Sequence, residues 1–372
     1  MNSLALVCML ALVLQNVAAS ACPDLLSPKV MIVNFFNPEG MVWYSNPDYD
    51  LLAQNVSVSG LSPPLRNTVP LFGDIHCTAD GEVCQLVTGR SEINTALSSL
   101  ALAFSDKFNL TQTYFLLNGI AGINPYIGSI NSVTLARFAV QADMQYEIDG
   151  RELPSNFSTG LWALSTDAPG QFPSAFMGTE VFELNDNLRR KIAAIAATAN
   201  LSDTVTAAAV RAQWKGTAGA AEPSVILTDT VTTNTYWTGE LLAESIGAYT
   251  SLVTNGTAVY GTTQNNDNAA LEGFLRGAVA KKLDFGRIIL MRTASDYDRP
   301  PPGESILDNL LYVDDGAFTS SLENLVNVGV LIIKDILTNW ASTYEIGIKA
   351  DNYMGDVMGT LGGTPDFGPG PA

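Results

Sequence analysis

The sequence predicts an α/β layered fold in which helices cover a largely parallel central sheet. Buried strand patterns alternate with helical patterns along most of the chain, as they do in βαβ units. Of the 372 residues, 47% are apolar, which is enough to bury a substantial core. We see no internal repeat and no linker, so we predict one domain over residues 22–358. The Gly/Pro-rich tail, residues 359–372, is predicted to be disordered.

The first half of the chain contains three short apolar runs and one run with helical spacing. The apolar runs are typical of buried strands: "KVMIVNFF" (29–36), "QLVTG" (85–89) and "TYFLLNG" (113–119). The segment "SEINTALSSLALAF" (91–104) predicts a helix whose apolar residues lie on one face, namely Ile93, Leu97, Leu100 and Phe104.

The second half repeats the pattern. Two runs predict strands, "SVILTDT" (224–230) and "GRIILMRTAS" (286–295). Three runs predict helices: "TGELLAESIGAYTSLV" (238–253), "NAALEGFLRGAVAKK" (268–282) and "LENLVNVGVLIIKDILTNW" (322–340).

The chain begins with the pattern of a secretory signal peptide, residues 1–21. Eleven consecutive apolar residues, 4–14, precede small residues, and cleavage is expected after Ala19 or Ala21. A membrane anchor is the alternative, but the apolar run is shorter than the roughly 20 residues that a spanning helix needs. Further along, the best apolar run, 325–333, stops at Lys334. We therefore expect a secreted or secretory-pathway protein with no membrane span.

Net charge restricts the class of ligand. The chain carries 37 acidic and 19 basic residues, for a net charge of −18. So acidic a surface repels the phosphates of nucleic acids and anionic membranes, and it favours a small neutral ligand.

The cysteines and the single histidine limit the chemistry further. "HCTADGEVC" places Cys77 and Cys84 around Asp80-Gly81, a dipeptide favoured in hairpin turns, so a disulfide is predicted in an oxidising compartment. Cys22 is left over. A Cys and His metal site at His76 is the less favoured alternative, and we expect no metal ion and no cofactor. One histidine also removes most routes to Ser-His or Cys-His catalysis. Five Asn-x-Ser/Thr triplets are compatible with secretion: Asn55, Asn109, Asn156, Asn200 and Asn255.

Three predicted strand ends carry residues suited to a ligand site, because ligands of α/β sheets bind at the carboxyl ends of strands. "YFLLN" leads to glycines through which backbone amides can approach a ligand. "VILTD" leads to "TVTTNTYW", and "RIILMRTA" leads to a Ser-Asp pair. Each segment taken alone is better explained as the turn that ends a strand.

Four segments resemble the purine nucleoside permease family, and their order resembles the wider nucleoside phosphorylase and methylthioadenosine nucleosidase superfamily. The segments are "NGIAGINP" (118–125), "ARFAVQADMQYEID" (136–149), "TQNNDNAALEGFLRG" (263–277) and "MRTASDYDRPP" (291–301). The resemblance covers nearly the whole mature chain. It implies a three-layer nucleoside-phosphorylase-like fold, with a mixed, largely parallel sheet flanked by helices, and it implies a purine nucleoside as ligand.

The resemblance also implies roles for individual residues. Asp296 falls where superfamily enzymes place the aspartate that hydrogen-bonds and can protonate the purine N7, and Ser295 precedes it. Tyr236 or Trp237 falls where an aromatic ring stacks on the base. Arg292 is expected to hold this loop through a carboxylate or the ligand. The glycine-rich strand end supplies further binding residues: Asn118, Gly119, Ile120, Ala121 and Gly122. The alternative for Asp296 is a surface ion pair with Arg299.

The sugar-binding helix departs from the superfamily pattern. Where superfamily enzymes have a second glutamate, this chain reads Asn266-Asp267-Asn268. The Asn268 amide can bond a hydroxyl group, but it cannot balance positive charge on the sugar as a carboxylate does. Asp267 or Glu272 is the candidate replacement.

The choice of nucleophile has its own sequence signals. Phosphorylases of the superfamily carry an arginine where this chain has Leu117, so the resemblance favours hydrolysis over phosphorolysis. Glu39 lies near the position of the nucleosidases' catalytic glutamate, and an ordinary exposed loop acid is the alternative. Four arginines remain candidates for binding an anion: Arg90, Arg137, Arg292 and Arg299.

Two function classes therefore stay open. In the first, a secreted enzyme cleaves the N-glycosidic bond of a purine nucleoside. In the second, a non-catalytic protein binds nucleoside and passes it to a separate transporter, as the family name implies. The resemblance also leads us to expect a homo-oligomer.

Overall fold

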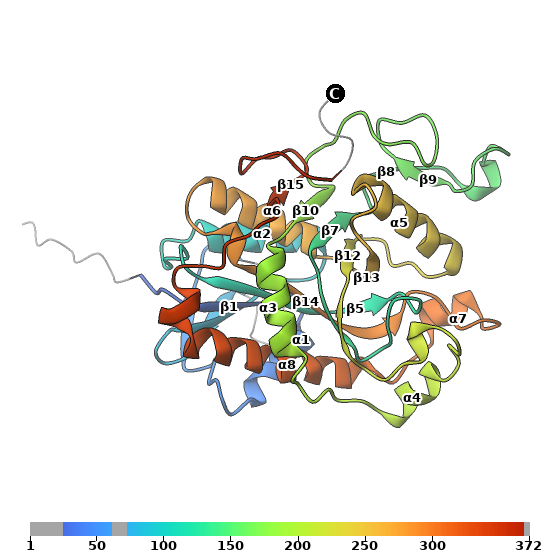
Figure 1. Cartoon of the computed structure of the whole chain (residues 1–372). Helices are drawn as coiled ribbons and strands as arrows, with labels where there is room; N and C mark the ends of the chain where they lie inside the picture. Colours follow the sequence, from blue (N-terminus) through green and yellow to red (C-terminus); the bar gives the residue numbers. More distant parts are fainter. Residues whose placement is uncertain (1–24, 62–72, 368–372) are drawn as a thin grey trace, which may run out of the picture.

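The computed structural model describes residues 25–61 and 73–367 (Figure 1). The predicted signal peptide and Cys22 lie outside these residues. None of the helices in the described part of the chain is both long and apolar enough to cross a membrane.

A 13-stranded mixed sheet forms the centre of the molecule. Its main path follows the order β15-β10-β7-β12-β13-β5-β1-β4-β3-β2, and β14, β6 and β11 branch from β5. The strands are β1 (Val30–Asn34), β2 (Gln54–Ser57), β3 (Asp74–Cys77), β4 (Val83–Val87), β5 (Tyr114–Ile123), β6 (Val133–Leu135), β7 (Phe138–Gln141), β10 (Val181–Glu183), β11 (Val225–Leu227), β12 (Asp229–Thr232), β13 (Tyr260–Gln264), β14 (Ile288–Tyr297) and β15 (Gly355–Asp356). A separate hairpin pairs β8 (Gln145–Glu147) with β9 (Leu161–Ala163).

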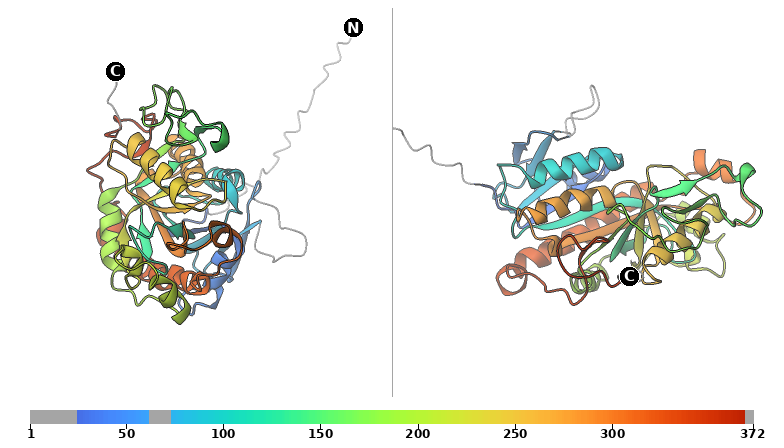
Figure 2. Two further views of the ribbon diagram at one scale, coloured as in Figure 1. Left: turned by 90° about the vertical axis from the view of Figure 1, so that its right-hand side faces the viewer. Right: turned by 90° about the horizontal axis from the view of Figure 1, so that it is seen from above.

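Helices cover both faces of the sheet, which gives the expected three layers. They are α1 (Asn37–Met41), α2 (Ser91–Ala103), α3 (Asp186–Ala196), α4 (Val205–Arg211), α5 (Glu240–Val253), α6 (Asp267–Val279), α7 (Ile306–Leu311) and α8 (Phe318–Thr338). Helices α2 and α6 pack together on one side of the long strands, and α8 lies on the other (Figure 2).

Strand β1 explains why both faces need a cover. All five of its residues are buried, and successive side chains point to opposite faces. Met31 and Val33 join the cluster that contains Phe274 of α6, whereas Ile32 joins the cluster that contains Leu325 of α8. A strand buried on both faces is a near-continuous apolar run, which is why this one was recognisable in the sequence.

Strand β5 changes neighbours halfway along its length. Its first part pairs in parallel with β1, from Val30 opposite Tyr114 to Val33 opposite Leu117. Beyond the end of β1, the same edge of β5 pairs with antiparallel β13 at Gly122 and Ile123. Strand β14 runs parallel to β5 along the other edge. The chain of β1 therefore leaves the sheet beside β5, at a topological switch point of the kind that binds ligands in α/β sheets.

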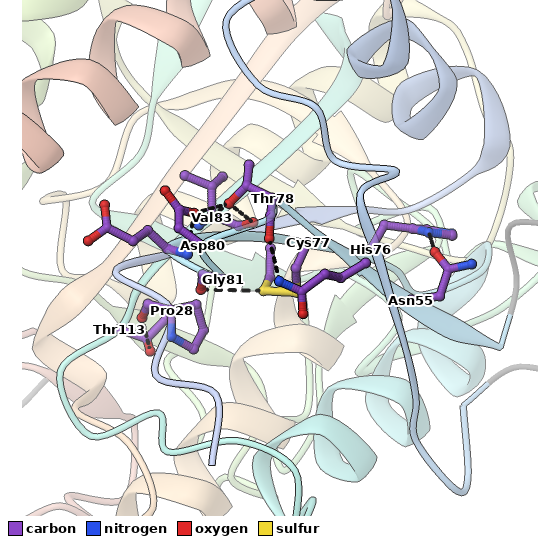
Figure 3. Close-up of a disulfide and its surroundings, with 12 residues drawn as sticks. Pro28, Asn55, His76, Cys77, Thr78, Asp80, Gly81, Val83 and Thr113 are labelled. Atoms are coloured by element: carbon purple, nitrogen blue, oxygen red, sulfur yellow. Dashed lines mark hydrogen bonds between the residues drawn. A yellow bond between two sulfur atoms is a disulfide. The ribbon is translucent and has the colours of Figure 1, made fainter. Parts of the chain in front are cut away.

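The predicted Cys77–Cys84 disulfide is confirmed (Figure 3). The two cysteines are direct partners across the β3–β4 hairpin, and Gly81 takes a positive φ of 70° in the turn between them. Because both thiols are in the disulfide, they are not available as metal ligands with His76. The His76 ring instead forms a 2.7 Å hydrogen bond through Nδ1 with the Asn55 side chain.

The face expected to be apolar on the helix at 91–104 lies in solvent instead. Ile93 is 73% exposed and Leu97 is 58% exposed, whereas Thr95 and Ser98 are buried. The buried hydroxyls hydrogen-bond the strand-to-helix turn, Thr95 to the Gly89 carbonyl and Ser98 to the Thr88 carbonyl. Spacing alone located the helix correctly but not its buried face.

The predicted disordered tail is ordered over residues 359–367. Phe367 is 5% exposed, and its ring lies 5.5 Å from that of Phe138 and 6.0 Å from that of Tyr353. Thr360 donates hydrogen bonds to the carboxylate of Asp356 at 2.8 and 2.6 Å. The composition of this segment is that of a disordered tail, but one aromatic side chain anchors it to the core.

Candidate functional site

A pocket of about 340 Å³ lies where β1 leaves the sheet beside β5. Its volume is within the range of small-molecule sites. The lining residues come from the ends of β1 and β13, from β5 and β14, from α1 and the start of α8, and from the loops that follow β4, β12 and β13: Phe35, Phe36, Glu39, Arg90, Ile120, Ala121, Gly122, Thr233, Thr235, Tyr236, Trp237, Thr263, Gln264, Asn265, Asn266, Arg292, Ser295, Asp296 and Phe318. The structure thus brings the three predicted strand ends together with Glu39 in one cavity.

Glu39 is fixed by backbone amides at the base of this pocket. It is 1% exposed, so the alternative of an exposed loop acid is wrong. Its Oε2 accepts hydrogen bonds from the N–H groups of Phe35 (2.7 Å) and Phe36 (3.2 Å), and its Oε1 accepts one from the N–H of Ile120 (2.8 Å). Burial raises the pKa of Glu39 from 4.5 to about 7, against the opposing effects of the Arg292 charge and these N–H donors. A carboxyl group with this pKa changes protonation near neutral pH.

Arg292 is held beside Glu39 by a buried ion pair. Its Nε donates to Oδ2 of Asp267 at 3.1 Å, and its Nη2 pairs with Oδ1 of the same carboxylate. Its Nη1 donates to the Ile120 carbonyl at 3.0 Å, and its guanidinium lies 4.2 Å from the centre of the Phe35 ring. The Asp267 carboxylate, the Ile120 carbonyl and the Phe35 ring therefore hold the guanidinium in place beside the pocket. The prediction that Arg292 pairs with a carboxylate is met by Asp267.

Asp296 is open to the pocket at the far end of β14. The Ser295 hydroxyl donates a 2.6 Å hydrogen bond to Oδ1 of Asp296. Desolvation by the surrounding protein raises the pKa of Asp296, and the charge of Asp298 raises it further, while the Ser295 bond opposes the shift. A β-carbon at residue 122 would lie 3.1 Å from Oδ2 of Asp296. The absence of a side chain at Gly122 therefore avoids a steric clash with this carboxyl group.

Arg299 does not pair with Asp296, and the ion-pair alternative for Asp296 is wrong. The Arg299 Nε donates instead to Oδ1 of Asp298 at 2.7 Å, and the Tyr260 hydroxyl donates to Oδ2 at 2.7 Å. Arg299 and Asp298 are each 2% exposed. This buried pair leaves Asp296 without a cationic partner among the described residues.

Aromatic rings and hydroxyl groups form the remaining walls. Trp237 packs with its ring centre 6.4 Å from that of Tyr260, and Tyr236 is 71% exposed at the rim. The rings of Phe36 and Phe318 lie 6.4 Å apart on another wall. Flat apolar rings of this kind suit a planar heterocycle, which stacks on them without a fixed hydrogen-bond pattern.

Four predicted binding residues do not line the pocket. Asn118 is fully buried and donates to the Leu325 carbonyl at 3.2 Å, because β5 continues past it. Gly119 is packed beneath the pocket against Arg292 and Glu39. Asp267 lies behind Arg292, as described above.

The fourth is Asn268, whose amide is engaged inside the protein. It donates to the Thr179 carbonyl at 2.8 Å and accepts from the Thr232 hydroxyl at 2.7 Å. Glu272 does not replace it, since its carboxylate pairs with Arg276 at 2.6 Å, away from the pocket. The residues of this segment that do line the pocket are Thr263, Gln264, Asn265 and Asn266.

Comparison with known proteins identifies the family. The family model described as purine nucleoside permease (NUP) matches residues 27–349. A purine nucleoside permease of Candida albicans is 39% identical over 347 residues, which cover 92% of this chain and 83% of the relative. A probable purine nucleoside permease of Schizosaccharomyces pombe is 36% identical over 325 residues, which cover 84% of this chain and 90% of the relative. The chain belongs to the purine nucleoside permease family.

Solved structures similar to this purine nucleoside permease family member include nucleosidases. The 5′-methylthioadenosine/S-adenosylhomocysteine nucleosidase of Neisseria meningitidis is 12% identical, with a TM-score of 0.48, and the match covers 84% of this chain and 100% of that one. The corresponding nucleosidase of Streptococcus pneumoniae, in complex with 8-aminoadenine, has 12% identity and a TM-score of 0.47, with coverage of 82% and 99%.

Several pocket residues of the family member were not predicted from the sequence. Phe35 and Phe36 are the last two residues of the first predicted strand, so the rule that ligands bind at strand ends was sufficient to find them. Thr233 and Thr235 lie in the segment "TVTTNTYW", which follows the predicted strand end "VILTD". Thr263 and Gln264 are the last residues of β13, and Asn265 and Asn266 follow them. Phe318 at the start of α8 had no local signal, because only the three-dimensional fold brings it to the pocket.

Proposed function

We propose that this protein binds a purine nucleoside in the pocket and cleaves its N-glycosidic bond with water. One observation carries the proposal: the two carboxyl groups that line the pocket, Glu39 and Asp296, both have raised pKa values. Groups with perturbed pKa values that share a cleft are typical of acid–base catalysis. The aromatic residues of the same pocket suit a purine ring.

Asp296 is the proposed general acid. Cleavage of the bond between the sugar C1′ and the base N9 leaves the electron pair of that bond on the departing base. The protonated Asp296 donates its proton to N7 of the base, so the base leaves as a neutral molecule. Desolvation keeps a share of Asp296 protonated at a higher pH than usual, and the Ser295 hydroxyl orients the carboxyl.

Glu39 is the proposed general base. Its carboxylate accepts a proton from water while the water oxygen bonds to C1′, so the products are the free base and the free sugar. Because its pKa is about 7, a substantial fraction of Glu39 is ionised near neutral pH. Arg292 faces the same part of the pocket, and its charge favours the ionised form of Glu39.

Product analysis tests this proposal. Purified mature protein is incubated with inosine, adenosine or guanosine, with and without inorganic phosphate, and the free base and sugar products are measured. Hydrolysis requires free ribose at a rate that does not depend on phosphate, and ribose 1-phosphate as the sugar product would refute water as the nucleophile.

A binding protein without catalysis is the second candidate. The observation in its favour is that the sugar-binding segment supplies amides to the pocket and no carboxylate, so positive charge on the sugar has less support. In this case nucleosides bind with measurable affinity in calorimetry, no base is released on prolonged incubation, and a separate transporter carries the ligand. A homo-oligomer stays a prediction in either case.

We also propose that the protein is secreted. The disulfide requires an oxidising compartment to persist, and all five sequon asparagines are exposed: Asn55, Asn109, Asn156, Asn200 and Asn255. Expression in a eukaryotic secretory host, followed by enzymatic removal of N-glycans and N-terminal sequencing, tests this. A product that keeps residue 1 and carries no glycan would contradict it.

A further inference from the structure

A second pocket lies between α5 and the β8–β9 hairpin, and the proposed function does not use it. Its volume is about 320 Å³, close to that of the first pocket, and the two pockets share no lining residue. Strand β9 packs against α5, as the labels in Figure 1 show. This volume is within the range of sites for one small molecule.

Both walls of the second pocket are held in place by the protein itself. The hydroxyl groups of Thr159 and Ser245 share a 2.9 Å hydrogen bond, which joins the hairpin to α5. On β9, the ring centre of Trp162 lies 5.6 Å from that of Tyr146 and 5.3 Å from that of Phe157. A pocket whose walls are already positioned loses less entropy when a ligand binds.

One polar group that lines this pocket has no partner in the described part of the chain. Tyr249 is 5% exposed, and its hydroxyl forms no hydrogen bond with any described residue. The hydroxyl of a buried tyrosine usually has a partner. Burial raises the pKa of Tyr249, so the hydroxyl keeps its proton and is able to donate to an oxygen atom of a ligand.

Charge restricts the class of ligand. Among the described residues that line the second pocket, Glu244 is the one charged residue, and none is a lysine, arginine or histidine. A carboxylate accepts hydrogen bonds and donates none. Glu244 therefore favours a ligand that carries hydrogen-bond donors and no negative charge.

The lining combines apolar surface with a set of hydroxyl groups. The indole ring of Trp162 and two leucine side chains, Leu241 and Leu252, supply apolar surface. The hydroxyl groups come from four residues: Ser158, Thr159, Ser245 and Tyr249. A sugar ring has two matching parts, because its C–H groups form an apolar face that packs on an indole ring and its hydroxyl groups both donate and accept hydrogen bonds. A free purine base carries fewer donors and would leave most of these groups without a partner.

We propose that the second pocket binds an uncharged sugar, either as a free monosaccharide or as the end of a glycan chain. The Tyr249 hydroxyl donates to a sugar oxygen, and the Glu244 carboxylate accepts from sugar hydroxyl groups. This site is separate from the reaction proposed above, because none of its lining residues belongs to the first pocket.

Saturation-transfer NMR and calorimetry on the purified mature protein test the proposal. The probes are ribose, glucose, mannose and N-acetylglucosamine, linear oligosaccharides of glucose and of mannose, and inosine and adenine for comparison. At least one sugar should bind. A monosaccharide site predicts that an oligosaccharide binds no more tightly than its single unit, whereas a glycan site predicts tighter binding of the oligosaccharide.

Variants show whether a sugar binds in this pocket. Tyr249→Phe removes the hydroxyl alone, so it should weaken sugar binding about three- to tenfold. Because this hydroxyl has no partner among the described residues, the variant should unfold at the same urea concentration as wild type. Glu244→Gln keeps the shape of the side chain and should weaken binding by a similar factor. Tyr146→Phe is the matched control, because Tyr146 is 43% exposed and does not line the pocket, and its sugar affinity should equal that of wild type.

Three results would overturn the proposal. The first is that none of the sugars tested binds to wild-type protein. The second is a sugar affinity that Tyr249→Phe leaves unchanged, because the sugar would then bind elsewhere. The third is inosine or adenine that binds in place of the sugars and is weakened by Tyr249→Phe, which would assign the pocket to a heterocyclic ligand.

Discussion

Replacing Glu39 by glutamine should change how the stability of the protein depends on pH. The pKa of Glu39 is 4.5 in an ordinary environment and about 7 in the folded protein. The folded state therefore holds a proton between these two values that the unfolded chain has released. A group of this kind contributes most to stability below its unfolded pKa, and the contribution is lost as pH rises through the folded value. Wild-type stability should thus fall between about pH 4.5 and 7 because of Glu39, and the variant should lack this fall.

The size of the effect follows from the shift. One pKa unit corresponds to about 1.4 kcal/mol, so a shift of roughly two and a half units corresponds to about 3 kcal/mol. Glutamine also disturbs the N–H groups that Glu39 accepts from, which costs about 1–3 kcal/mol. That second cost does not depend on pH. The difference in unfolding free energy between variant and wild type should therefore move by about 3 kcal/mol in favour of the variant from pH 4 to pH 8.

Urea denaturation followed by tryptophan fluorescence at several pH values measures this difference. Glu147→Gln is the matched control, because Glu147 is exposed on β8 and lies outside the pocket. A Glu39→Gln difference that stays constant across this pH range would refute the reasoning, since it would mean that Glu39 titrates alike in the folded and unfolded states. If the protein is a hydrolase, its activity should rise with pH through about 7, as the base ionises.

Three further predictions concern the site and the hairpin. Asp296→Asn removes the proposed acid at nearly constant size, so base release should slow by about 100-fold or more while the fold is retained, which product assays and circular dichroism check. Gly119→Ala places a methyl group against three pocket side chains, so it should cost about 1–3 kcal/mol in urea denaturation and reduce nucleoside affinity as well. Cys77→Ser combined with Cys84→Ser opens a loop with a sequence separation of 7 residues, so the thermal or urea stability should fall by about 2 kcal/mol.

Each of these has a simple control. Asp106→Asn changes an aspartate whose side chain is 87% exposed, and it should leave turnover unchanged. Gly150→Ala adds a methyl group where no atom beyond the two neighbouring residues of the chain lies within 4 Å, and it should leave affinity unchanged. Wild type under reducing conditions should match the double serine variant. Equal behaviour of a site variant and its control would count against the role assigned to that residue.

The strands and helices that could be predicted are those whose burial leaves a pattern in the sequence. Strand β1 and the first four residues of β14 are mainly buried apolar residues, and α8 is long with an apolar stripe, so each was located within a few residues. Strand β5 was predicted to end at Gly119, because glycine commonly ends a strand. Pairing with β14 on one edge and β13 on the other keeps it extended to Ile123, and neither partner is visible locally.

Site residues could be predicted where a suitable side chain also lies at a recognisable strand end. They could not be predicted where contacts with distant segments determine whether the side chain reaches the pocket. Asp296 and Ser295 were identified by the family resemblance together with their place at the end of a strand, and they do line the pocket. Asn118 has equally suitable chemistry, but the continuation of β5 places it in the core, where it donates to α8. Asp267 faces Arg292 and not the pocket, because a buried guanidinium requires a carboxylate partner. Contacts of this kind join segments that are far apart in the sequence, so neither segment alone contains a pattern that predicts them.

The position of β5 determines when the protein can complete its pocket during synthesis. One edge of β5 pairs with β14 and so stays unpaired until β14 has been synthesised. The first residue of β14, Ile288, lies opposite Phe115 of β5. Until that part of the chain has left the ribosome, a strand whose residues are almost all buried in the native state has an unpaired apolar edge. Long-range strand pairing of this kind is slow and prone to aggregation. A nascent chain halted before β14 should therefore depend on chaperones, and ligand can bind only after nearly the whole chain has been made.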